Sequence, residues 1–258
     1  ISILGCGWLG LSLGSTLVNY QHHVCGSTTR LSRLSLIAHK GIKPYLVDLN
    51  PWFSGDVSFF EADILVVNLP PRNQAGDPHF HRKQLETVRD CARKGCVKRI
   101  IFVSSTAVYP DLNRVVHEND ADKDSLSRSG ISLLEMENIF KEEKQFQTTV
   151  IRFGGLYGPD RHPGRFLRGK SSVPGANNPV NVIHRDDCIA IIKSIIDNGV
   201  WGETLNACSP NKVSRKEFYS EAAKEIQIDP PTFSKEPQPY KDVSPKKLIN
   251  LLNYHFIH

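Results

Sequence analysis

The sequence predicts an α/β fold in which a doubly wound parallel sheet is covered by helices on both faces. Three observations carry this prediction. Residues 1–4 form a short strand-like run that leads into a glycine-rich turn and then a helical pattern. Residues 62–69 are almost continuously apolar, as expected for a parallel strand buried on both faces. Further strand-like runs at 98–105 and 148–153 alternate with helical patterns, which indicates repeated strand–helix units.

The turn after the first strand reads Gly5-Cys6-Gly7-Trp8-Leu9-Gly10, the glycine spacing of a dinucleotide-binding turn. Gly5 permits the tight turn, Gly7 lets a pyrophosphate approach the backbone, and Gly10 lets the helix pack close to the strand. The N–H groups and the positive end of that helix would then face the phosphates. We therefore predict a Rossmann-type sheet with a nucleotide at this turn; the alternative is a merely structural turn.

The residues after the second predicted strand, 24–27, decide which dinucleotide would fit. NAD-selective sites carry an acidic residue about 20 positions after the glycines. This chain has Thr28, Thr29 and Arg30 there, followed by Arg33. A guanidinium pairs with a 2′-phosphate, whereas a carboxylate would repel it. We expect NADP rather than NAD; the alternative is that both arginines are simply solvated.

Two more strand ends are expected beside the cofactor, because the carboxyl ends of parallel strands line the ligand crevice. Asp48 ends the third predicted strand, residues 43–49, and could accept a hydrogen bond from an adenine amino group or cap the next turn. The apolar fourth strand ends at Asn68, Leu69 and Pro70.

The fifth and sixth predicted strands also end in candidate site residues. Hydroxyl groups at the open end of a central strand suit a polar substrate, although a serine there can equally be a plain cap. The residues at these two ends complete the predicted cofactor-binding set: Ser104, Phe153 and Gly154.

Helical patterns at 79–94 and 125–144 precede these two strands. His79 and His81 are two residues apart and do not share a helix face, so they form no metal-binding pair. The six cysteines show no metal-ligand spacing, and we predict no metal site.

The segment from residue 160 to 178 is rich in Arg, Gly and Pro. Its cationic side chains are Arg161, Arg165, Arg168 and Lys170. This composition favours a flexible substrate loop that binds a phosphate or carboxylate; the alternative is a solvated basic loop.

The rest of the chain is expected to add a short strand, several helices and a proline-rich connector. Ser214 and Glu217 form a capping box that opens a helix. We place a dinucleotide-binding domain at residues 1–158, with 180–208 returning to it, and a small substrate subdomain at 159–179 and 209–258.

The composition limits the possible partners. The chain has 258 residues and a net charge of +5, without a basic run interleaved with aromatic residues, so we expect no nucleic acid. No run of about 18 apolar residues occurs, and we expect no membrane span. Scattered cysteines and the absence of a visible signal peptide favour a cytoplasmic location. The mild positive charge favours a small-molecule, anionic substrate.

Several motifs together resemble the extended short-chain dehydrogenase/reductase superfamily, in particular its nucleotide-sugar epimerase/dehydratase branch and the atypical bacterial YeeZ-like proteins. The motifs are the glycine turn 5–10, Phe102-Val103-Ser104-Ser105-Thr106-Ala107-Val108-Tyr109, Arg152-Phe153-Gly154-Gly155-Leu156-Tyr157-Gly158-Pro159, and Asn181-Val182-Ile183-His184-Arg185-Asp186-Asp187. The resemblance implies about seven parallel strands, a small substrate subdomain and, by analogy, a possible homodimer.

The sequence departs from this superfamily at its catalytic Tyr-x-x-x-Lys pair, in which the lysine lowers the tyrosine pKa. Ser129 stands at the tyrosine position and Leu133 at the lysine position, while Gly130 and Glu137 keep the register. A serine without a partner is a poor acid or base, and leucine cannot tune a pKa.

The resemblance assigns the catalytic serine to Ser105, so a replacement acid must come from elsewhere. The candidates are Tyr109, Tyr157 and His184, which all lie in or after predicted strands near the site.

We therefore expect an NADP-dependent oxidoreductase or epimerase/dehydratase-like enzyme that acts on a sugar-like or other polar anionic substrate. The alternative is a non-catalytic NADP(H)-binding sensor or regulator, favoured by the missing pair. A third alternative, a structural protein that no longer binds nucleotide, conflicts with the intact glycines.

Overall fold

A computed structural model describes residues 1–71, 77–121 and 128–258, with the backbone alone at 128 and 129. The chain forms two compact units. Unit 1 comprises Ile1–Ser104, Leu134–Ile151 and Ile192–Thr204, and unit 2 comprises Ser105–Leu133, Arg152–Ile191 and Leu205–His258.

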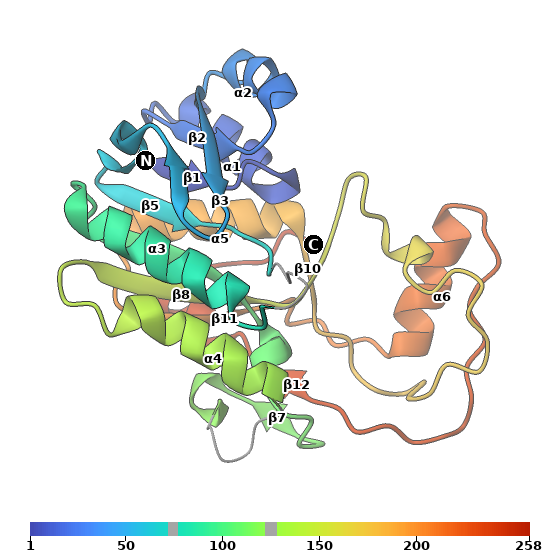
Figure 1. The fold of residues 1–258 in the computed structure, drawn as a ribbon. Coiled ribbons are helices and arrows are strands. Elements are labelled where there is room, and N and C mark those ends of the chain that lie inside the picture. The colour runs from blue at the N-terminus through green and yellow to red at the C-terminus, as the bar shows by residue number, and fades with distance from the viewer. Residues whose placement is uncertain (72–76, 122–127) are drawn as a thin grey trace. The chain divides into compact units, whose positions relative to one another are not determined.

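The main sheet has eight strands in the order β11-β8-β6-β5-β1-β2-β3-β4 (Figure 1). Strand β1 pairs in parallel with both β2 and β5, and the parallel pairing continues to β3 on one side and β6 on the other. The strands are β1 (Ser2–Leu4), β2 (Cys25–Thr28), β3 (Lys43–Leu49), β4 (Phe53–Gly55), β5 (Ile64–Val67), β6 (Arg99–Ser105), β8 (Gln147–Phe153) and β11 (Thr204–Ala207).

The predicted α/β class and Rossmann-type sheet are confirmed, and the expected count of about seven strands needs a correction. The additional strand is β4, which lies in a segment expected to be only a connection. It pairs antiparallel with β3, with Asp48 opposite Ser54. A three-residue edge strand buries too little surface to leave a periodic apolar pattern, so the sequence does not reveal it.

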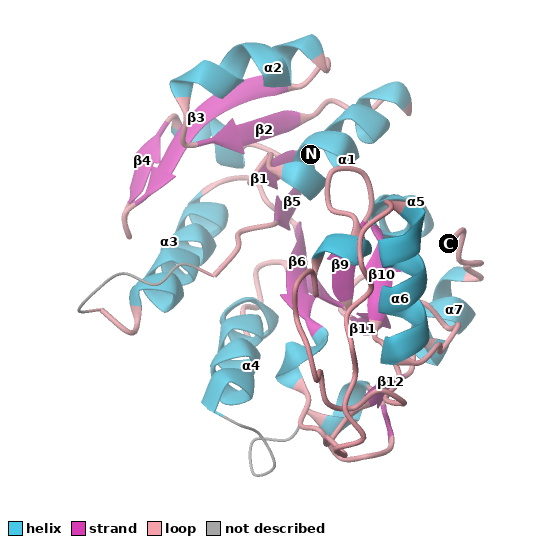
Figure 2. Cartoon of the chain, turned by 90° about the vertical axis from the view of Figure 1, so that its right-hand side faces the viewer, coloured by secondary structure: helices cyan, strands magenta, loops and turns pink. Residues whose placement is uncertain are grey.

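The helices are α1 (Trp8–Asn19), α2 (Leu34–His39), α3 (Phe80–Lys94), α4 (Arg128–Lys141), α5 (Arg185–Asn198), α6 (Arg215–Glu225) and α7 (Lys246–Leu252). In unit 1, α3 and the α4 segment that belongs to it lie on one side of β5 and β6, and α1 lies on the other (Figure 2). Helices on both sides explain why all four residues of β5 are buried apolar side chains.

Unit 2 contains two small parallel pairs. Strand β9 (Gly155–Tyr157) pairs with β10 (Val182–His184), so that Tyr157 lies opposite His184. Strand β7 (Val115–Val116) pairs with β12 (Asp242–Val243), which fastens the C-terminal segment to the loop after β6.

The apolar core of unit 1 is built around aromatic side chains. Phe59 and Phe60 are fully buried and meet edge to face, with ring centroids 5.3 Å apart, and Phe59 also meets Tyr45 edge to face. The same core includes Leu85 of α3 and Phe140 of α4. This cluster joins the short helical turn before β5 to the helices that cover the sheet.

In the part of the chain that the structure describes, no helix combines the length and the apolar character that a membrane span requires.

We expect Phe59→Ala to lower the free energy of unfolding by about 3–5 kcal/mol, because it empties a packed aromatic site. Trp52→Ala is the matched control, since 70% of Trp52 is exposed, and it should change stability by no more than about 0.5 kcal/mol. Urea unfolding measures both. Similar losses for the two variants would contradict the packing described here.

Candidate functional site

The turn between β1 and α1 is built by close contacts that only glycine permits. Gly5 has a φ of +100°, and a Cβ on it would lie 2.4 Å from the Asn68 carbonyl oxygen. A Cβ on Gly10 would lie 2.2 Å from the Gly5 carbonyl oxygen. Helix α1 therefore begins directly against the end of β1.

The polar groups of this turn are held by side chains of the neighbouring strands. The Gly5 N–H donates to Ser27 Oγ at 2.9 Å, and Asn68 Nδ2 donates to the Gly5 carbonyl oxygen at 3.0 Å. Asn68 therefore supports the turn from the end of β5. Pro70, two residues later, is exposed. Leu69, half-buried, packs against the core of unit 1.

Gly7 faces open space. Among the described residues, and apart from Gly7 itself and its two chain neighbours, no atom lies within 4 Å of the position that a Cβ would take on it. Among the described residues, no side chain caps α1, and its first turn holds no acidic residue. The N–H groups and positive dipole end of α1 are thus available to an anion, and the geometry fits a phosphate. Trp8 is half-buried and Leu9 buried at the start of the helix.

A cation lies beside this turn. Arg33 ends a short 3₁₀ turn after β2, and its Nη2 donates to the Cys6 carbonyl oxygen at 3.2 Å. Arg30 is exposed, and its N–H donates to Thr28 Oγ1. Thr29 is also exposed. Arg33, which was named as a cofactor-binding candidate from its distance to the glycines along the chain, therefore contacts the glycine turn within unit 1.

Asp48 is exposed near the end of β3, and its Oδ1 accepts a hydrogen bond from the N–H of Leu49 at 2.9 Å. Ser104 is buried at the end of β6 and donates to Oε1 of the buried Glu137 at 2.6 Å. Ser104 is thereby committed to a contact within unit 1.

Ser105 begins unit 2 and is half-buried. Its Oγ accepts a hydrogen bond from the Ala107 N–H at 3.1 Å and caps the 3₁₀ turn that follows β6. Among the described residues, no acceptor is found for the Ser105 hydroxyl proton. The hydroxyl can still donate to a ligand while its oxygen caps the turn.

Tyr109 is part of a buried polar network in unit 2. Its hydroxyl donates to Asn206 Oδ1 at 2.6 Å and accepts from Arg152 Nη1 at 2.7 Å. Arg152 also donates to the Glu118 carbonyl oxygen. Burial raises the pKa of Tyr109 to about 12, against the opposing effect of Arg152. Because acid–base catalysis needs a pKa near the working pH, this geometry favours a structural role for Tyr109.

Tyr157 and His184 lie side by side in unit 2, with ring centroids 5.2 Å apart. Among the described residues, the Tyr157 hydroxyl has no hydrogen-bond partner. His184 Nδ1 accepts from the Asp186 N–H at 3.2 Å. Burial, aided by His258, lowers the pKa of His184. A neutral His184 with an occupied Nδ1 carries its proton on Nε2, so it acts as a donor.

One group of described residues has the side-chain types of a metal site: His184, Asp186 and His258, whose ligand atoms lie within 4.8 Å of one another. The His184 Nδ1 atom that faces Asp186 is occupied by a backbone N–H. Arg185 Nε lies 3.7 Å from the same carboxylate and competes with a cation. The arrangement works as a polar cluster without a metal, and we assign no metal to it.

Packing explains two further predicted cofactor positions, Phe153 and Gly154. Phe153 is buried, and a Cβ on Gly154 would lie 2.7 Å from the Asn181 carbonyl oxygen. The side chain of Ser129 lies outside the described residues, and Leu133 lies in α4.

Sequence reasoning missed the hydrogen bonds by which Asp187 holds the C-terminal segment, which we call the clamp at Asp187. Asp187 is fully buried and accepts hydrogen bonds from Tyr254 Oη at 2.7 Å and from the N–H groups of Ile257 and His258. Asn181 binds the Lys241 and Val243 backbones in the same unit. Nothing local in the sequence shows this contact, because the Ile257 donor lies 70 residues from Asp187.

Comparisons with solved structures identify the fold. UDP-glucuronic acid 4-epimerase from Bacillus cereus, in complex with NAD, superimposes with a TM-score of 0.80 at 17% identity and covers 100% of this chain and 94% of its own. MoeE5 in complex with UDP-glucose and NAD gives 0.79 at 18% identity, over 100% of this chain and 93% of its own. The chain therefore shares the fold of these two proteins.

A closer sequence relative defines the family. Protein YeeZ of Escherichia coli (strain K12) is 32% identical over 237 residues, which cover 90% of this chain and 86% of YeeZ. The chain belongs to the YeeZ family, as the motifs predicted. No family model matches the sequence.

We expect Tyr109→Phe to lower the free energy of unfolding by about 1–3 kcal/mol, because it removes the buried hydroxyl that Asn206 Oδ1 and Arg152 Nη1 contact. Tyr157→Phe should change stability by no more than about 0.5 kcal/mol, since its hydroxyl makes no such contact. Urea unfolding compares the two variants. The opposite order of losses would contradict the network.

Proposed function

We propose that this protein binds NADP(H) at the glycine turn of unit 1 and acts as an oxidoreductase or epimerase/dehydratase-like enzyme on a polar anionic substrate. The observation that carries the proposal is the open space at Gly7, next to the uncapped N terminus of α1. A turn that served packing alone would not leave the position of a Cβ empty there. The NAD named with the structural neighbours supports a dinucleotide.

The choice of NADP rests on the charge around the turn. Arg33 reaches the Cys6 carbonyl oxygen, and Arg30 is exposed nearby in the sequence. The stretch from Thr28 to Arg33 contains no carboxylate that would bind the ribose hydroxyls of NAD or repel a 2′-phosphate. Both guanidiniums have spare N–H groups for a phosphate.

When bound, a nicotinamide dinucleotide supplies or accepts a hydride. We assign to Ser105 the donation of a hydrogen bond to a substrate oxygen, because its hydroxyl proton is uncommitted within the described chain. Tyr157 and His184 are the remaining candidates for proton transfer, since Tyr109 is committed to its network. The six free cysteines accord with a reducing, cytoplasmic setting.

The second candidate function is a non-catalytic NADP(H)-binding sensor. It is favoured by Ser129 and Leu133, which stand where the superfamily carries its tyrosine and lysine. NADPH binding without turnover on any nucleotide sugar or small aldehyde would select this alternative.

We expect Arg33→Ala and Arg30→Ala to weaken NADPH binding by at least roughly tenfold, because each removes a charged partner of the 2′-phosphate. NADH binding should change less than about twofold. Titrations followed by the fluorescence of Trp8, which lies within the turn, measure both affinities.

Lys40→Ala is the control for charge alone, since Lys40 is exposed at the end of α2. Trp8→Phe removes the tryptophan of the turn, so the fluorescence change that this variant loses is the part that comes from Trp8. Equal losses of NADPH and NADH affinity in the arginine variants would argue against the 2′-phosphate contact, and no response to either dinucleotide would overturn the proposed function.

We expect Ser105→Ala to lower kcat by roughly a hundredfold, since it removes a donor to the substrate oxygen. Ser105→Thr keeps the hydroxyl and should keep most of the turnover. NADPH oxidation in the presence of nucleotide sugars or aldehydes is the assay. Unchanged turnover in Ser105→Ala would remove the assigned role.

A further inference from the structure

The C-terminal segment of unit 2 carries one half of a stacked histidine pair. The rings of His184, in β10, and His258 have centroids 3.8 Å apart and planes tilted by 42°. The His184 ring also meets the Tyr157 ring edge to face. The side chain of His184 is 12% exposed and that of His258 is 41% exposed. His258 therefore forms part of the cover over a nearly enclosed imidazole.

The two imidazoles lie beside one carboxylate. Asp186 Oδ2 is 3.7 Å from His184 Nδ1 and 3.8 Å from His258 Nε2. Arg185 Nε lies 3.7 Å from the other oxygen, Oδ1, of the same carboxylate. The titratable and charged groups around the pair, taken from every described element that contacts it, are Tyr157, Arg185, Asp186, Asp187 and Tyr254.

The charges of this cluster accommodate one proton on the imidazoles and oppose a second. Asp186 and Asp187 supply two negative charges at neutral pH, and Arg185 supplies one positive charge. A single protonated imidazole balances the remaining negative charge. Protonation of both histidines would put two positive charges on rings 3.8 Å apart and leave the cluster with an excess of positive charge.

Burial of His184 acts in the same direction. Burial, followed by the neighbouring His258, lowers the pKa of His184, against the opposing effect of Asp186 and Asp187. A histidine whose pKa is lowered in a packed state stabilises that state above its ordinary pKa of about 6.5, and this contribution is lost as the pH falls below that value. Acid therefore favours a state in which the two rings separate and become hydrated.

The clamp at Asp187 is the attachment that opposes this separation. The carboxylate accepts from Tyr254 Oη at 2.7 Å, from the Ile257 N–H at 2.8 Å and from the His258 N–H at 3.2 Å. The longest of these bonds belongs to the residue whose ring the second proton would repel. Ile257 is itself 64% exposed and adds little apolar burial. Residues 257 and 258 are thus the part of the segment that repulsion between the rings would detach first.

We propose that residues 257 and 258 form an acid-released cover on His184, which stays attached to Asp187 at neutral pH and detaches when both His184 and His258 are protonated. The inference goes beyond the proposed function, because all of these residues belong to unit 2 and no dinucleotide takes part. Detachment uncovers the His184 ring. Any effect on turnover rests on the proposed role of His184 in proton transfer, whereas the detachment itself does not.

The test is hydrogen exchange of the full chain, followed by NMR, which reports how strongly the Ile257 and His258 amides are protected. We expect both protection factors to fall by at least roughly tenfold between about pH 7.5 and about pH 5, because the two N–H groups leave Asp187. His258→Phe keeps a ring for stacking and cannot take a proton, so its Ile257 amide should stay protected at the lower pH.

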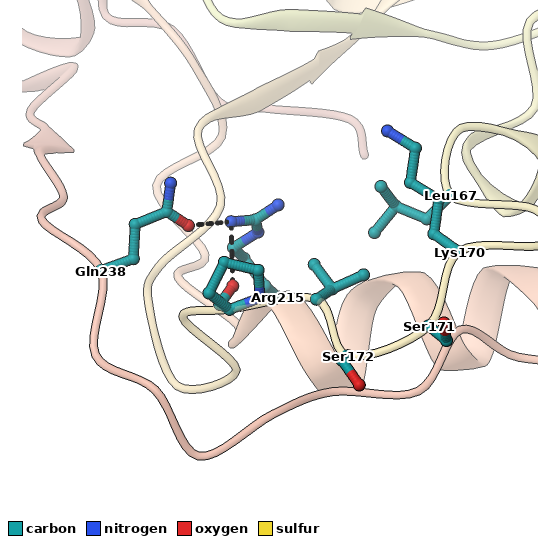
Figure 3. A pocket seen from close by; sticks show the side chains of 8 residues that line it. Leu167, Lys170, Ser171, Ser172, Arg215 and Gln238 are labelled. Atoms are coloured by element: carbon teal, nitrogen blue, oxygen red, sulfur yellow. Dashed lines mark hydrogen bonds between the residues drawn. The ribbon is translucent and has the colours of Figure 1, made fainter.

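Two controls separate this release from a general effect of acid. His255→Phe makes the same substitution at an exposed position of the same segment and should respond to acid as the unaltered chain does. The second control is the pocket in Figure 3, where Arg215 Nη1 donates to Gln238 Oε1 at 3.0 Å. The described residues that line this pocket include no histidine. The Ser234 N–H, which donates to the carbonyl oxygen of the lining residue Val173 at 3.0 Å, should therefore keep its protection.

The proposal is overturned if protection at positions 257 and 258 is constant or rises on acidification, or if the Ser234 amide loses protection in parallel. It is also overturned if His258→Phe detaches as the unaltered chain does, or if His255→Phe stays attached at the lower pH. A chain that binds no NADPH would contradict the proposed function and would leave these exchange measurements unaffected.

Discussion

The structure of unit 1 depends on how closely helix α1 approaches the end of β1. The helix can start there only because position 10 has no side chain, since a Cβ would lie 2.2 Å from the Gly5 carbonyl oxygen. That approach places the N terminus of α1 at the edge of the sheet, where Ser27 and Asn68 hold the turn from the neighbouring strands. The packing therefore leaves the N–H groups and the positive dipole end of α1 available to an anion without any added charge.

Unit 2 contains buried polar side chains whose hydrogen-bonding groups are paired with one another. Arg152 is 2% exposed, and its partners include Tyr109 and the Glu118 backbone. Glu118 in turn accepts from the Asn206 N–H. A buried cation is tolerated when its donors are matched in this way, and removal of one partner leaves the rest uncompensated. Residues that resemble catalytic candidates in the sequence can thus be required by the network.

The sequence predicted the fold class, the glycine turn and the family from strong local patterns, each of which occupies a few adjacent residues. The distance of Arg33 from the glycines also placed it after β2, and the structure has it there, with Nη2 on the Cys6 carbonyl oxygen. The sequence could not predict the role of Tyr109, which depends on Asn206 almost a hundred residues later. Short-range spacing reveals motifs, whereas burial and partner choice follow from tertiary contacts that a single sequence does not contain.

The Asp187 carboxylate binds the C-terminal segment mainly through backbone groups and less through side chains. Two of its three donors are backbone N–H groups, at positions 257 and 258. Almost any amino acid can supply such a group, and proline is the exception because it has no N–H. Substitutions other than proline at positions 257 and 258 would consequently leave both of these hydrogen bonds to Asp187 in place.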